Sequence, residues 1–425
     1  MGTTEDEGTR ALVLHPDIKG SETPRDPAFA LDEAVSLAAA LPGLTLVGSE
    51  IVRLARPHPG MLFGKGKIDT LKTRIEAEEI ELVLIDGPVS PVQQRNLERA
   101  WKVKLLDRTG LILEIFSDRA ATREGVLQVE MAHLSYQRTR RVRAWTHLER
   151  QRGGLGFVGG PGETQIEADR RAIDDQLNRL RRQLEKVVKT RSLHRAARAK
   201  VPYPIVALVG YTNAGKSTIF NRLTGASVLA KDMLFATLDP TMRAVNLPGS
   251  GREVILSDTV GFISDLPTQL VAAFRATLEE VLAADVICHV RDISHPECEA
   301  QKTDVLSILA DLGIGEDRRL IEVWNKVDRL SEEAGATLKA QAARAENTVL
   351  SSAVTDAGLD DFLEAVEAAL DADRERTVIE LAYSEGRKRA WLHEQGVVTD
   401  VEDAEDRVRL SVNWTAAQRV RFSRL

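Results

Sequence analysis

The segment that most constrains this chain is Gly210-Tyr-Thr-Asn-Ala-Gly215-Lys216-Ser217. It follows the apolar run Ile205–Val209 and precedes a helical pattern of apolar residues. Glycines at this spacing let backbone N–H groups turn toward phosphate oxygens at the start of a helix. Lys216 is expected to reach the β- and γ-phosphates, and the Ser217 hydroxyl to ligate Mg²⁺. The segment therefore predicts a doubly wound α/β domain that binds a nucleoside triphosphate.

A second motif, Asp258-Thr-Val-Gly261, ends the apolar run that begins at Val254. An aspartate at the carboxyl end of that strand can hold Mg²⁺ through water. A glycine three residues later lets its backbone N–H approach the γ-phosphate. A lone DxxG is common, and its position after the phosphate loop is what makes it informative.

The third motif, Asn325-Lys326-Val327-Asp328, predicts which base is bound. The Asp328 carboxylate can accept hydrogen bonds from the ring N–H and the exocyclic amine of guanine, and adenine offers neither group there. A site built for such a pair discriminates strongly against a base that lacks it. Ser352-Ala353 follows another short strand-like run and is expected to add a backbone N–H to the guanine carbonyl.

Between these motifs lies Phe235-Ala-Thr237-Leu-Asp-Pro-Thr241, in which Thr237 stands where a switch threonine would contact Mg²⁺ and the γ-phosphate. Phe262 follows the DxxG motif, where many GTPases have a glutamine that orients the attacking water. A phenyl ring cannot do this, so slow basal hydrolysis and activation by a partner are expected. Asn213 is either a turn former or a ligand for K⁺, and hydrolysis rates in KCl and NaCl distinguish the two.

These motifs define the candidate site. The residues predicted to contact GTP are Gly210, Tyr211, Thr212, Asn213, Ala214, Gly215, Lys216, Ser217, Thr218, Phe235, Asp258, Thr259, Val260, Gly261, Asn325, Lys326, Asp328, Ser352 and Ala353. Those predicted to act in hydrolysis are Lys216, Thr237 and Gly261, and the predicted metal ligands are Ser217, Thr237 and Asp258.

Changes in the pattern of strand-like, helical and glycine-rich segments divide the chain into five parts. Strand-like and helical runs alternate before and after a long helical stretch, which is typical of α/β domains. The predicted parts are a disordered N-terminus (1–10), a small α/β subdomain (11–110), an antiparallel helical hairpin with a glycine-rich tip at 153–162 (111–200), the GTPase domain (201–372) and a small α+β domain (373–425).

The helical stretch is locally basic, although the formal net charge of the whole chain is −7. Residues 138–152 contain six arginines and one acid, and residues 179–200 contain nine basic residues and one acid. Such patches suit contacts with RNA phosphates, and the alternative is a solvated coiled-coil face. The glycine-rich tip is expected to bring its bare backbone close to RNA, and its alternative is a plain flexible connector. The RNA-contact candidates are Arg138, Arg140, Arg141, Arg143, Gly153, Gly154, Arg181 and Arg182.

The remaining composition excludes several classes of protein. Two cysteines, Cys288 and Cys298, cannot build a disulfide framework or a zinc site, and they suit a reducing cytosol. No stretch has the length and apolarity of a membrane span, and the acidic N-terminus does not resemble a secretory signal. A cytoplasmic protein is expected, and no feature demands a dimer.

Outside the nucleotide motifs, Gly64-Lys-Gly-Lys67, Asp107-Arg-Thr-Gly110 and the glycine-rich segment through Gln165 resemble the HflX-type GTPases along almost the whole chain. Val158-Gly159-Gly160 departs from the arginine often found in that family. The resemblance implies a two-part N-terminal region, binding to the large ribosomal subunit, and a role in splitting or rescuing stalled ribosomes under stress. It also suggests ATP binding by the N-terminal region.

Two other classes of function remain open from the sequence. One is a GTP-regulated scaffold whose hairpin binds a protein. The other is an ATP- or GTP-dependent RNA remodeller, although no phosphate loop of the GxxxxGK[ST] type precedes residue 210.

Overall fold

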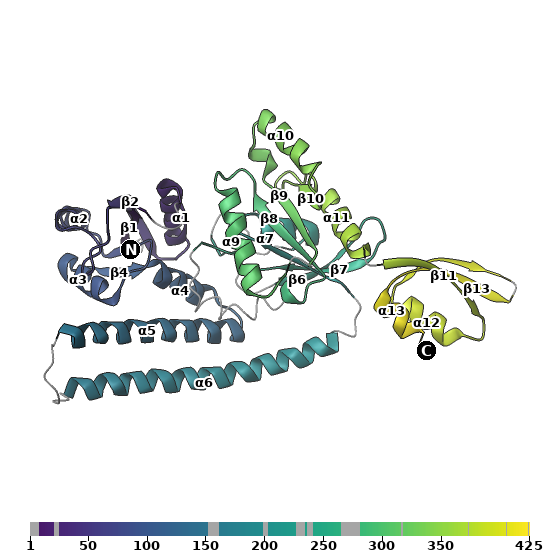
Figure 1. Cartoon of the computed structure of the whole chain (residues 1–425), viewed down its shortest axis with the longest axis horizontal. Coiled ribbons are helices and arrows are strands. Elements are labelled where there is room, and N and C mark those ends of the chain that lie inside the picture. The colour runs from purple at the N-terminus through teal and green to yellow at the C-terminus, as the bar shows by residue number, and fades with distance from the viewer. Residues whose placement is uncertain are drawn as a thin grey trace, which may run out of the picture. The chain divides into compact units, whose positions relative to one another are not determined.

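The computed structural model describes residues 8–20, 25–151, 161–198, 203–226, 234–235, 241–264, 281–315, 318–372, 374–404, 406–423 and 425 (Figure 1). Three sets of predictions lie outside this part of the chain: those for the terminal residues 1–7, for the tip glycines Gly153 and Gly154, and for Thr237. The chain divides into two compact units. Unit 1 is Met1–Arg191 with Lys231–Asp239 and Asp265–Ala276, and unit 2 is Ser192–Ala230, Pro240–Ser264 and Thr277–Leu425.

Unit 1 contains a four-stranded parallel sheet in the order β2-β1-β3-β4. Its core strands are continuous apolar runs, as expected for parallel strands covered on both faces; residues 11–14 of β1 are at most 1% exposed. The elements in chain order are β1 (Thr9–Ile18), α1 (Pro27–Ala39), β2 (Leu44–Leu54), α2 (Lys65–Ala77), β3 (Leu82–Ile85), α3 (Pro91–Trp101), β4 (Lys104–Asp107) and α4 (Arg108–Arg119).

Local sequence explains where two of these helices begin. The Ser90 side chain accepts a hydrogen bond from the Gln93 backbone N–H, and the Gln93 side chain accepts one from the Ser90 backbone N–H, forming a capping box before α3. Asp107 caps α4 by accepting a hydrogen bond from the Gly110 backbone N–H over 2.8 Å. These contacts direct the chain from the carboxyl ends of β3 and β4 back across the sheet.

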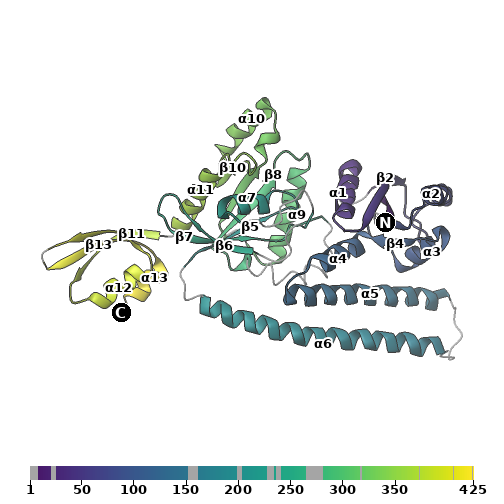
Figure 2. The same cartoon turned by 180° about the vertical axis from the view of Figure 1, so that it is seen from behind.

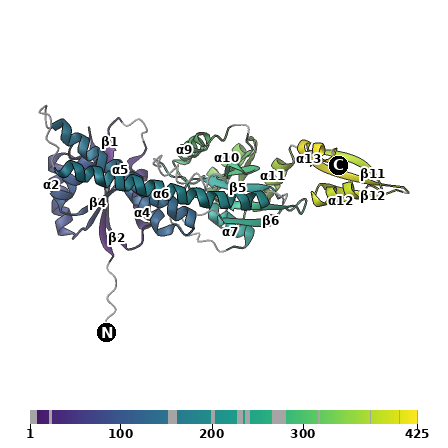
Figure 3. The same cartoon turned by 90° about the horizontal axis from the view of Figure 1, so that it is seen from below.

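Two long helices follow, α5 (Arg123–Gln151) and α6 (Pro161–Arg198). Figures 1 and 2 show them side by side and running in opposite directions, and they overlap in the view from below in Figure 3. Arg138 of α5 pairs with Asp174 of α6 over 2.8 Å. Ile173, Leu177 and Leu180 are at most 8% exposed, so the predicted apolar seam is buried in this part of α6.

Unit 2 contains a six-stranded sheet in the order β10-β9-β8-β5-β7-β6, in which only β6 is antiparallel to its neighbour. The sequence did not predict β6, because Thr-Met-Arg-Ala-Val-Asn is a largely exposed edge strand without an apolar run. The elements are β5 (Ile205–Gly210), α7 (Lys216–Thr224), β6 (Thr241–Asn246), β7 (Glu253–Asp258), β8 (Val286–Asp292), α9 (Cys298–Asp311), β9 (Leu320–Asn325), the short helix η1 (Val327–Arg329), α10 (Glu332–Ala342), β10 (Thr348–Leu350) and α11 (Leu359–Asp371).

A smaller sheet ends the chain, with the antiparallel order β11-β13-β12. Buried residues alternate along β13, from Val408 to Trp414, as expected when one face of a sheet packs on helices. The elements are β11 (Arg374–Ala382), α12 (Gly386–Glu394), β12 (Val398–Asp403), β13 (Arg407–Thr415) and α13 (Ala416–Phe422). Among the described residues of the whole chain, no helix is long and apolar enough to cross a membrane.

Candidate nucleotide site

The phosphate loop connects β5 to α7 and depends on two glycines whose φ angles are positive. Gly210 has a φ of 152°, and a Cβ there would lie 2.1 Å from the Val290 carbonyl oxygen. Gly215 has a φ of 101°, and a Cβ there would lie 2.1 Å from the Asn325 side-chain amide nitrogen. Only glycine fits at either position, so the motif glycines are required by close packing as well as by the turn.

Lys216 begins α7 and is 5% exposed. Its Nζ donates hydrogen bonds to the carbonyl oxygens of Gly210 (3.0 Å) and Tyr211 (2.8 Å). Burial lowers the pKa of Lys216 to about 8, and Asp258 opposes part of this shift. The carbonyl groups of the phosphate loop therefore bind the Lys216 ammonium group, which is the group that the sequence predicted to bind phosphate.

As a predicted phosphate ligand with a lowered pKa, Lys216 should make GTP affinity depend on pH. The charged ammonium group predominates below about pH 8, and it is this form that attracts phosphate. Raising the pH from 7 to 8.5 should therefore weaken GTP binding by about fourfold. Titrations with a fluorescent GTP analogue over this range measure the change. In Lys216→Arg, the arginine side chain stays protonated over this range. The affinity of this variant for GTP should therefore not change with pH, whatever its absolute value. An equally steep dependence on pH in the variant would show that Lys216 is not the group that titrates.

The predicted metal ligands Ser217 and Asp258 lie side by side. The Ser217 hydroxyl donates to Asp258 Oδ2 over 2.7 Å, and Asp258 is fully buried at the end of β7. A hydroxyl and a carboxylate are the hard oxygen donors that Mg²⁺ prefers. This pair therefore fits the metal, and Thr237, the third predicted ligand, lies outside the described residues.

The DxxG segment lies against the phosphate loop. Thr212 N donates to Phe262 O over 2.7 Å, and Phe262 N donates to Gly210 O over 3.1 Å. A Cβ on Gly261 would lie 2.8 Å from Thr212 Cγ2 and 3.1 Å from Lys216 Nζ. Glycine is therefore required here for the backbone to approach the lysine.

Phe262 is 1% exposed, so its ring belongs to the core. This position therefore presents no polar side chain to an attacking water. The hydroxyl of Thr259 donates to Leu208 O over 2.6 Å, and Val260 is 3% exposed. The Thr259 side chain is thus bonded to β5 and the Val260 side chain is buried. Only the backbone groups of these two predicted GTP contacts are available to bind a nucleotide.

The predicted guanine-binding residues form one connected group. Asn325 Nδ2 donates to Ala214 O over 2.9 Å, and its Oδ1 accepts from Ala353 N over 3.1 Å. Asp328 Oδ1 accepts from the Ser352 hydroxyl over 2.6 Å. Asn325 therefore links the phosphate loop to the loop after β10, and Ser352 orients the carboxylate predicted to read guanine.

Three supporting contacts were not predicted from the sequence. Lys326 Nζ pairs with Asp292 over 2.7 Å, at the carboxyl end of β8. The Tyr211 hydroxyl accepts a hydrogen bond from Ser264 N over 2.9 Å, which ties the phosphate loop to the segment after Gly261. The Ser351 hydroxyl lies 3.3 Å from Asn325 Oδ1. Only Asp292 had a local signal, as an acid two residues after the apolar run that ends at Val290.

Two predicted loop residues occupy ordinary backbone roles. Asn213 is exposed with a φ of 59°, a left-handed conformation that asparagine tolerates well. This geometry favours the turn-forming interpretation without testing K⁺ binding. Thr218 lies half-buried in the first turn of α7.

The side chain of Phe235 does not lie where the sequence prediction placed it, which was against GTP. It belongs to unit 1, is 2% exposed, and packs edge-on against Phe116, with 4.6 Å between the ring centroids. Its ring is instead a packing residue of the N-terminal unit.

One RNA-contact candidate also has a different role. Arg140 Nη2 forms an ion pair with Asp107, and its guanidinium lies 4.5 Å from the centre of the Tyr136 ring, whose hydroxyl also donates to Asp107. Arg140 therefore holds α5 against the N-cap of α4, which is a structural role and not the predicted RNA contact.

The other RNA-contact candidates differ in their surroundings. Arg138 is paired with Asp174, whereas Arg181 and Arg182 are exposed on α6. The side chains of Arg141 and Arg143 lie outside the described part.

A second cavity, which we call the N-terminal cavity, opens at the carboxyl edge of the parallel sheet in unit 1. Its volume is about 930 Å³, and its lining includes His15 and the charged residues Asp17, Lys19, Arg25, Asp86 and Arg108. It lies by β1 and β3, where successive connections leave in opposite directions, the usual place for a ligand in an open α/β sheet.

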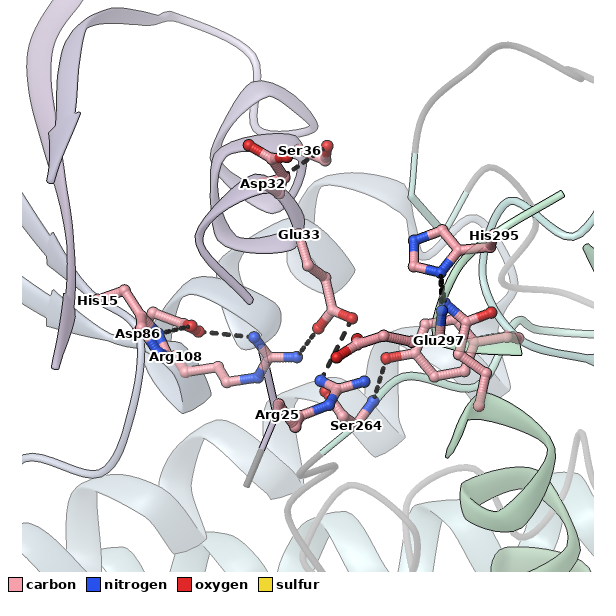
Figure 4. A network of polar contacts seen from close by, with 12 residues as sticks. His15, Arg25, Asp32, Glu33, Ser36, Asp86, Arg108, Ser264, His295 and Glu297 are labelled. Atoms are coloured by element: carbon pink, nitrogen blue, oxygen red, sulfur yellow. Dashed lines mark hydrogen bonds and ion pairs between the residues drawn. The ribbon is translucent and has the colours of Figure 1, made fainter. Parts of the chain in front are cut away.

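Ion pairs connect the residues at the base of this cavity (Figure 4). Arg108 pairs with Asp86 over 2.6 Å and also with Glu33, and His15 lies 2.8 Å from Asp86. Burial alone would raise the pKa of Asp86, but Arg108 and His15 outweigh it and hold this pKa below its usual value. The cluster is therefore charged and internally compensated.

Comparison with known proteins covers nearly the whole chain. The matching family models are described as "GTP-binding GTPase N-terminal" (residues 29–117), "GTP-binding GTPase Middle Region" (119–198), "50S ribosome-binding GTPase" (205–326) and "HflX C-terminal domain" (337–425).

Two relatives from other organisms agree with these matches. The protein GTPase HflX of Magnetococcus marinus is 49% identical over 387 residues, which cover 91% of this chain and 88% of the relative. GTPase HflX of Escherichia coli is 43% identical over 354 residues, 81% of this chain and 82% of the relative. A solved GTP-binding protein from Sulfolobus solfataricus in complex with GDP shares 22% identity with a TM-score of 0.46, covering 85% of this chain and 98% of that one.

Proposed function

Because this chain belongs to the HflX family of GTPases, we propose that it hydrolyses GTP on the large ribosomal subunit and thereby splits or rescues stalled ribosomes under stress. The observation that carries the nucleotide assignment is the hydrogen-bonded group of Asn325, Asp328 and Ser352 joined to the phosphate loop at Ala214. The description of the matched family as a 50S ribosome-binding GTPase supports the ribosomal partner.

In the proposed reaction, water attacks the γ-phosphorus while the bond to the β-phosphate oxygen breaks, which gives GDP and phosphate. GTP binding exchanges the carbonyl acceptors of Lys216 for phosphate oxygens, and Lys216 with the Gly261 backbone N–H then stabilises the developing charge. When bound, Mg²⁺ would neutralise charge on the β- and γ-phosphates. Ser217, Asp258 and Thr237 would hold it.

The buried ring of Phe262 leaves the site without a side chain that orients water at that position. We assign that task to a group supplied by the ribosome. The hairpin of α5 and α6 is the proposed contact with ribosomal RNA, through Arg181, Arg182, Arg141, Arg143 and the tip glycines Gly153 and Gly154. We propose that the protein acts as a monomer in the cytoplasm.

The test is GTP hydrolysis by the purified chain with and without large ribosomal subunits, in KCl and in NaCl. Subunits should accelerate hydrolysis by on the order of 100-fold or more, which is the effect of supplying one missing transition-state contact. A fast basal rate that subunits leave unchanged would contradict the ribosomal role and favour the scaffold alternative. Equal rates in the two salts would remove K⁺ from the mechanism.

Lys216→Ala is the matched control in the same assay. It should abolish GTP hydrolysis with and without subunits, because the lysine is the main cation of the phosphate loop. ATP hydrolysis that survives Lys216→Ala would favour the RNA-remodeller alternative and would direct attention to the N-terminal cavity.

A further inference from the structure

The loop between β10 and α11, residues 351–358, is held from two sides, and we call it the base loop. It carries Ser352 and Ala353 of the proposed guanine site. On one side, Asn325 Oδ1 accepts a hydrogen bond from Ala353 N over 3.1 Å. On the same side, Asp328 Oδ1 accepts one from the Ser352 hydroxyl over 2.6 Å. The other contacts come from a residue outside the nucleotide motifs.

Arg222 makes these contacts from the last turn of α7. Its Nε donates to the carbonyl oxygen of Ala353, and its Nη2 donates to that of Val354, both over 3.2 Å. The Nε atom also lies 3.3 Å from Asp356 Oδ1. Both backbone groups of Ala353 are therefore bonded, the N–H to Asn325 and the carbonyl to Arg222.

The backbone of the base loop has an uncommon conformation that needs such contacts. Asp356 has a φ of 63°, which aspartate tolerates better than most residues but still adopts rarely. Val354 is 66% exposed, so burial contributes little to fixing this part of the loop. Polar contacts hold it instead: Ser352 N donates to Ala357 O over 2.9 Å within the loop, and Arg222 binds it from α7.

The two carbonyl contacts of Arg222 matter more than its ion pair. The side chain of Arg222 is 49% exposed and that of Asp356 is 58% exposed, and solvent screens a pair at this exposure. A guanidinium, by contrast, has several donors in one fixed plane and can bond two carbonyl oxygens at once. A lysine has a single nitrogen and cannot reproduce this geometry.

We propose that Arg222 is a positioning residue that holds the base loop in its nucleotide-binding conformation and thereby sets the rate at which GDP leaves. The inference rests on the proposed function, which assigns Ser352 and Ala353 to guanine. The same helix begins at Lys216 in the phosphate loop, and Arg222 lies about 9 Å further along it. One helix thus supports the nucleotide at both ends, through Lys216 at the phosphates and through Arg222 at the base loop.

Release of a fluorescent GDP analogue from the full-length chain tests this role. Arg222→Ala should speed release by about tenfold, because the loop loses two hydrogen bonds from a charged donor. Arg222→Lys should recover part of the slow release. The KM for GTP should rise in Arg222→Ala while kcat changes by less than twofold, since Lys216 and Gly261, which are assigned to the γ-phosphate, keep their places.

Two further variants isolate the carbonyl contacts. Asp356→Asn removes the carboxylate but keeps a residue that tolerates the left-handed conformation, so release should speed by about twofold at most. Arg344→Ala is the matched control, because Arg344 lies exposed just after α10 of the same unit, and it should leave release unchanged.

The outcomes separate this role from general stabilisation and from the proposed function. Release from Arg222→Ala at the unaltered rate would refute the role of Arg222 and leave the GTPase assignment standing. A kcat that falls together with the unfolding temperature of the nucleotide-free protein would also refute it, because the residue would then act only in stability. If the unaltered chain does not bind the GDP analogue, the proposed nucleotide site is wrong and the inference fails with it.

Discussion

Asp328→Asn is expected to weaken GTP binding by about a thousandfold and to make xanthosine triphosphate the preferred ligand. In the proposed site the Asp328 carboxylate accepts two hydrogen bonds from guanine, and each bond to a charged group contributes about 2 kcal/mol. The Ser352 hydroxyl, 2.6 Å from Asp328 Oδ1, holds the carboxylate in one orientation. An amide in its place presents a donor that matches the second carbonyl of xanthine. Competition between the two nucleotides for a fluorescent analogue measures the change.

Ser352→Ala is the matched comparison for this substitution. This substitution removes the hydroxyl that orients Asp328 but leaves the carboxylate in place. The affinity for GTP should therefore fall by only about tenfold, and guanine should still be the preferred base. An unchanged guanine preference in Asp328→Asn would show that another residue reads the base.

Gly261→Ala is expected to reduce GTP hydrolysis by about a hundredfold or more while GDP still binds. The added methyl group would lie 2.8 Å from Thr212 Cγ2, 2.9 Å from Thr212 Cα and 3.1 Å from Lys216 Nζ. The Thr212 backbone cannot move aside as the end of a flexible side chain can. The DxxG segment that contains Gly261 must therefore move away from the phosphate loop. Its N–H then loses the γ-phosphate, and removal of one such donor costs about two to three orders of magnitude in rate. Single-turnover hydrolysis and GDP titration measure the two effects separately.

Gly335→Ala controls for the general effect of adding a methyl group. Gly335 lies within α10, where a Cβ would meet nothing within 4 Å, so hydrolysis should be unchanged and the helix slightly stabilised. A Gly261→Ala protein that hydrolyses GTP normally would mean that this backbone does not approach the γ-phosphate.

The grouping of the residues of the proposed nucleotide site was largely predictable because the motifs are local in sequence. Each motif directly follows a strand, and strand ends of a parallel sheet meet at one edge. The contacts of Asn325 with Ala214 and Ala353, and of Ser217 with Asp258, are consistent with this expectation. The strands themselves were predictable from apolar runs, except for the exposed edge strand β6.

The roles of Phe235, Arg140 and Arg108 could not be read in the same way. Phe235 stands in a switch-like motif but packs against Phe116, and Arg140 stands in a basic run but pairs with Asp107. Arg108 pairs with Asp86 and Glu33, although the sequence indicated only that Asp107-Arg-Thr-Gly110 resembles a family motif. In each case the partner lies between 22 and 119 residues away, and no local periodicity encodes it.

The sequence by itself determined the catalytic chemistry and the order of the elements. A phosphate loop, a DxxG turn and an NKxD motif act through backbone geometry and side chains within a few residues of one strand end. Only the tertiary structure decided which charged side chains form structural contacts and that residues 231–239 belong to unit 1. Those outcomes depend on burial and on partners distant in the chain, which determine whether a cation such as Arg140 faces solvent or a fixed acceptor.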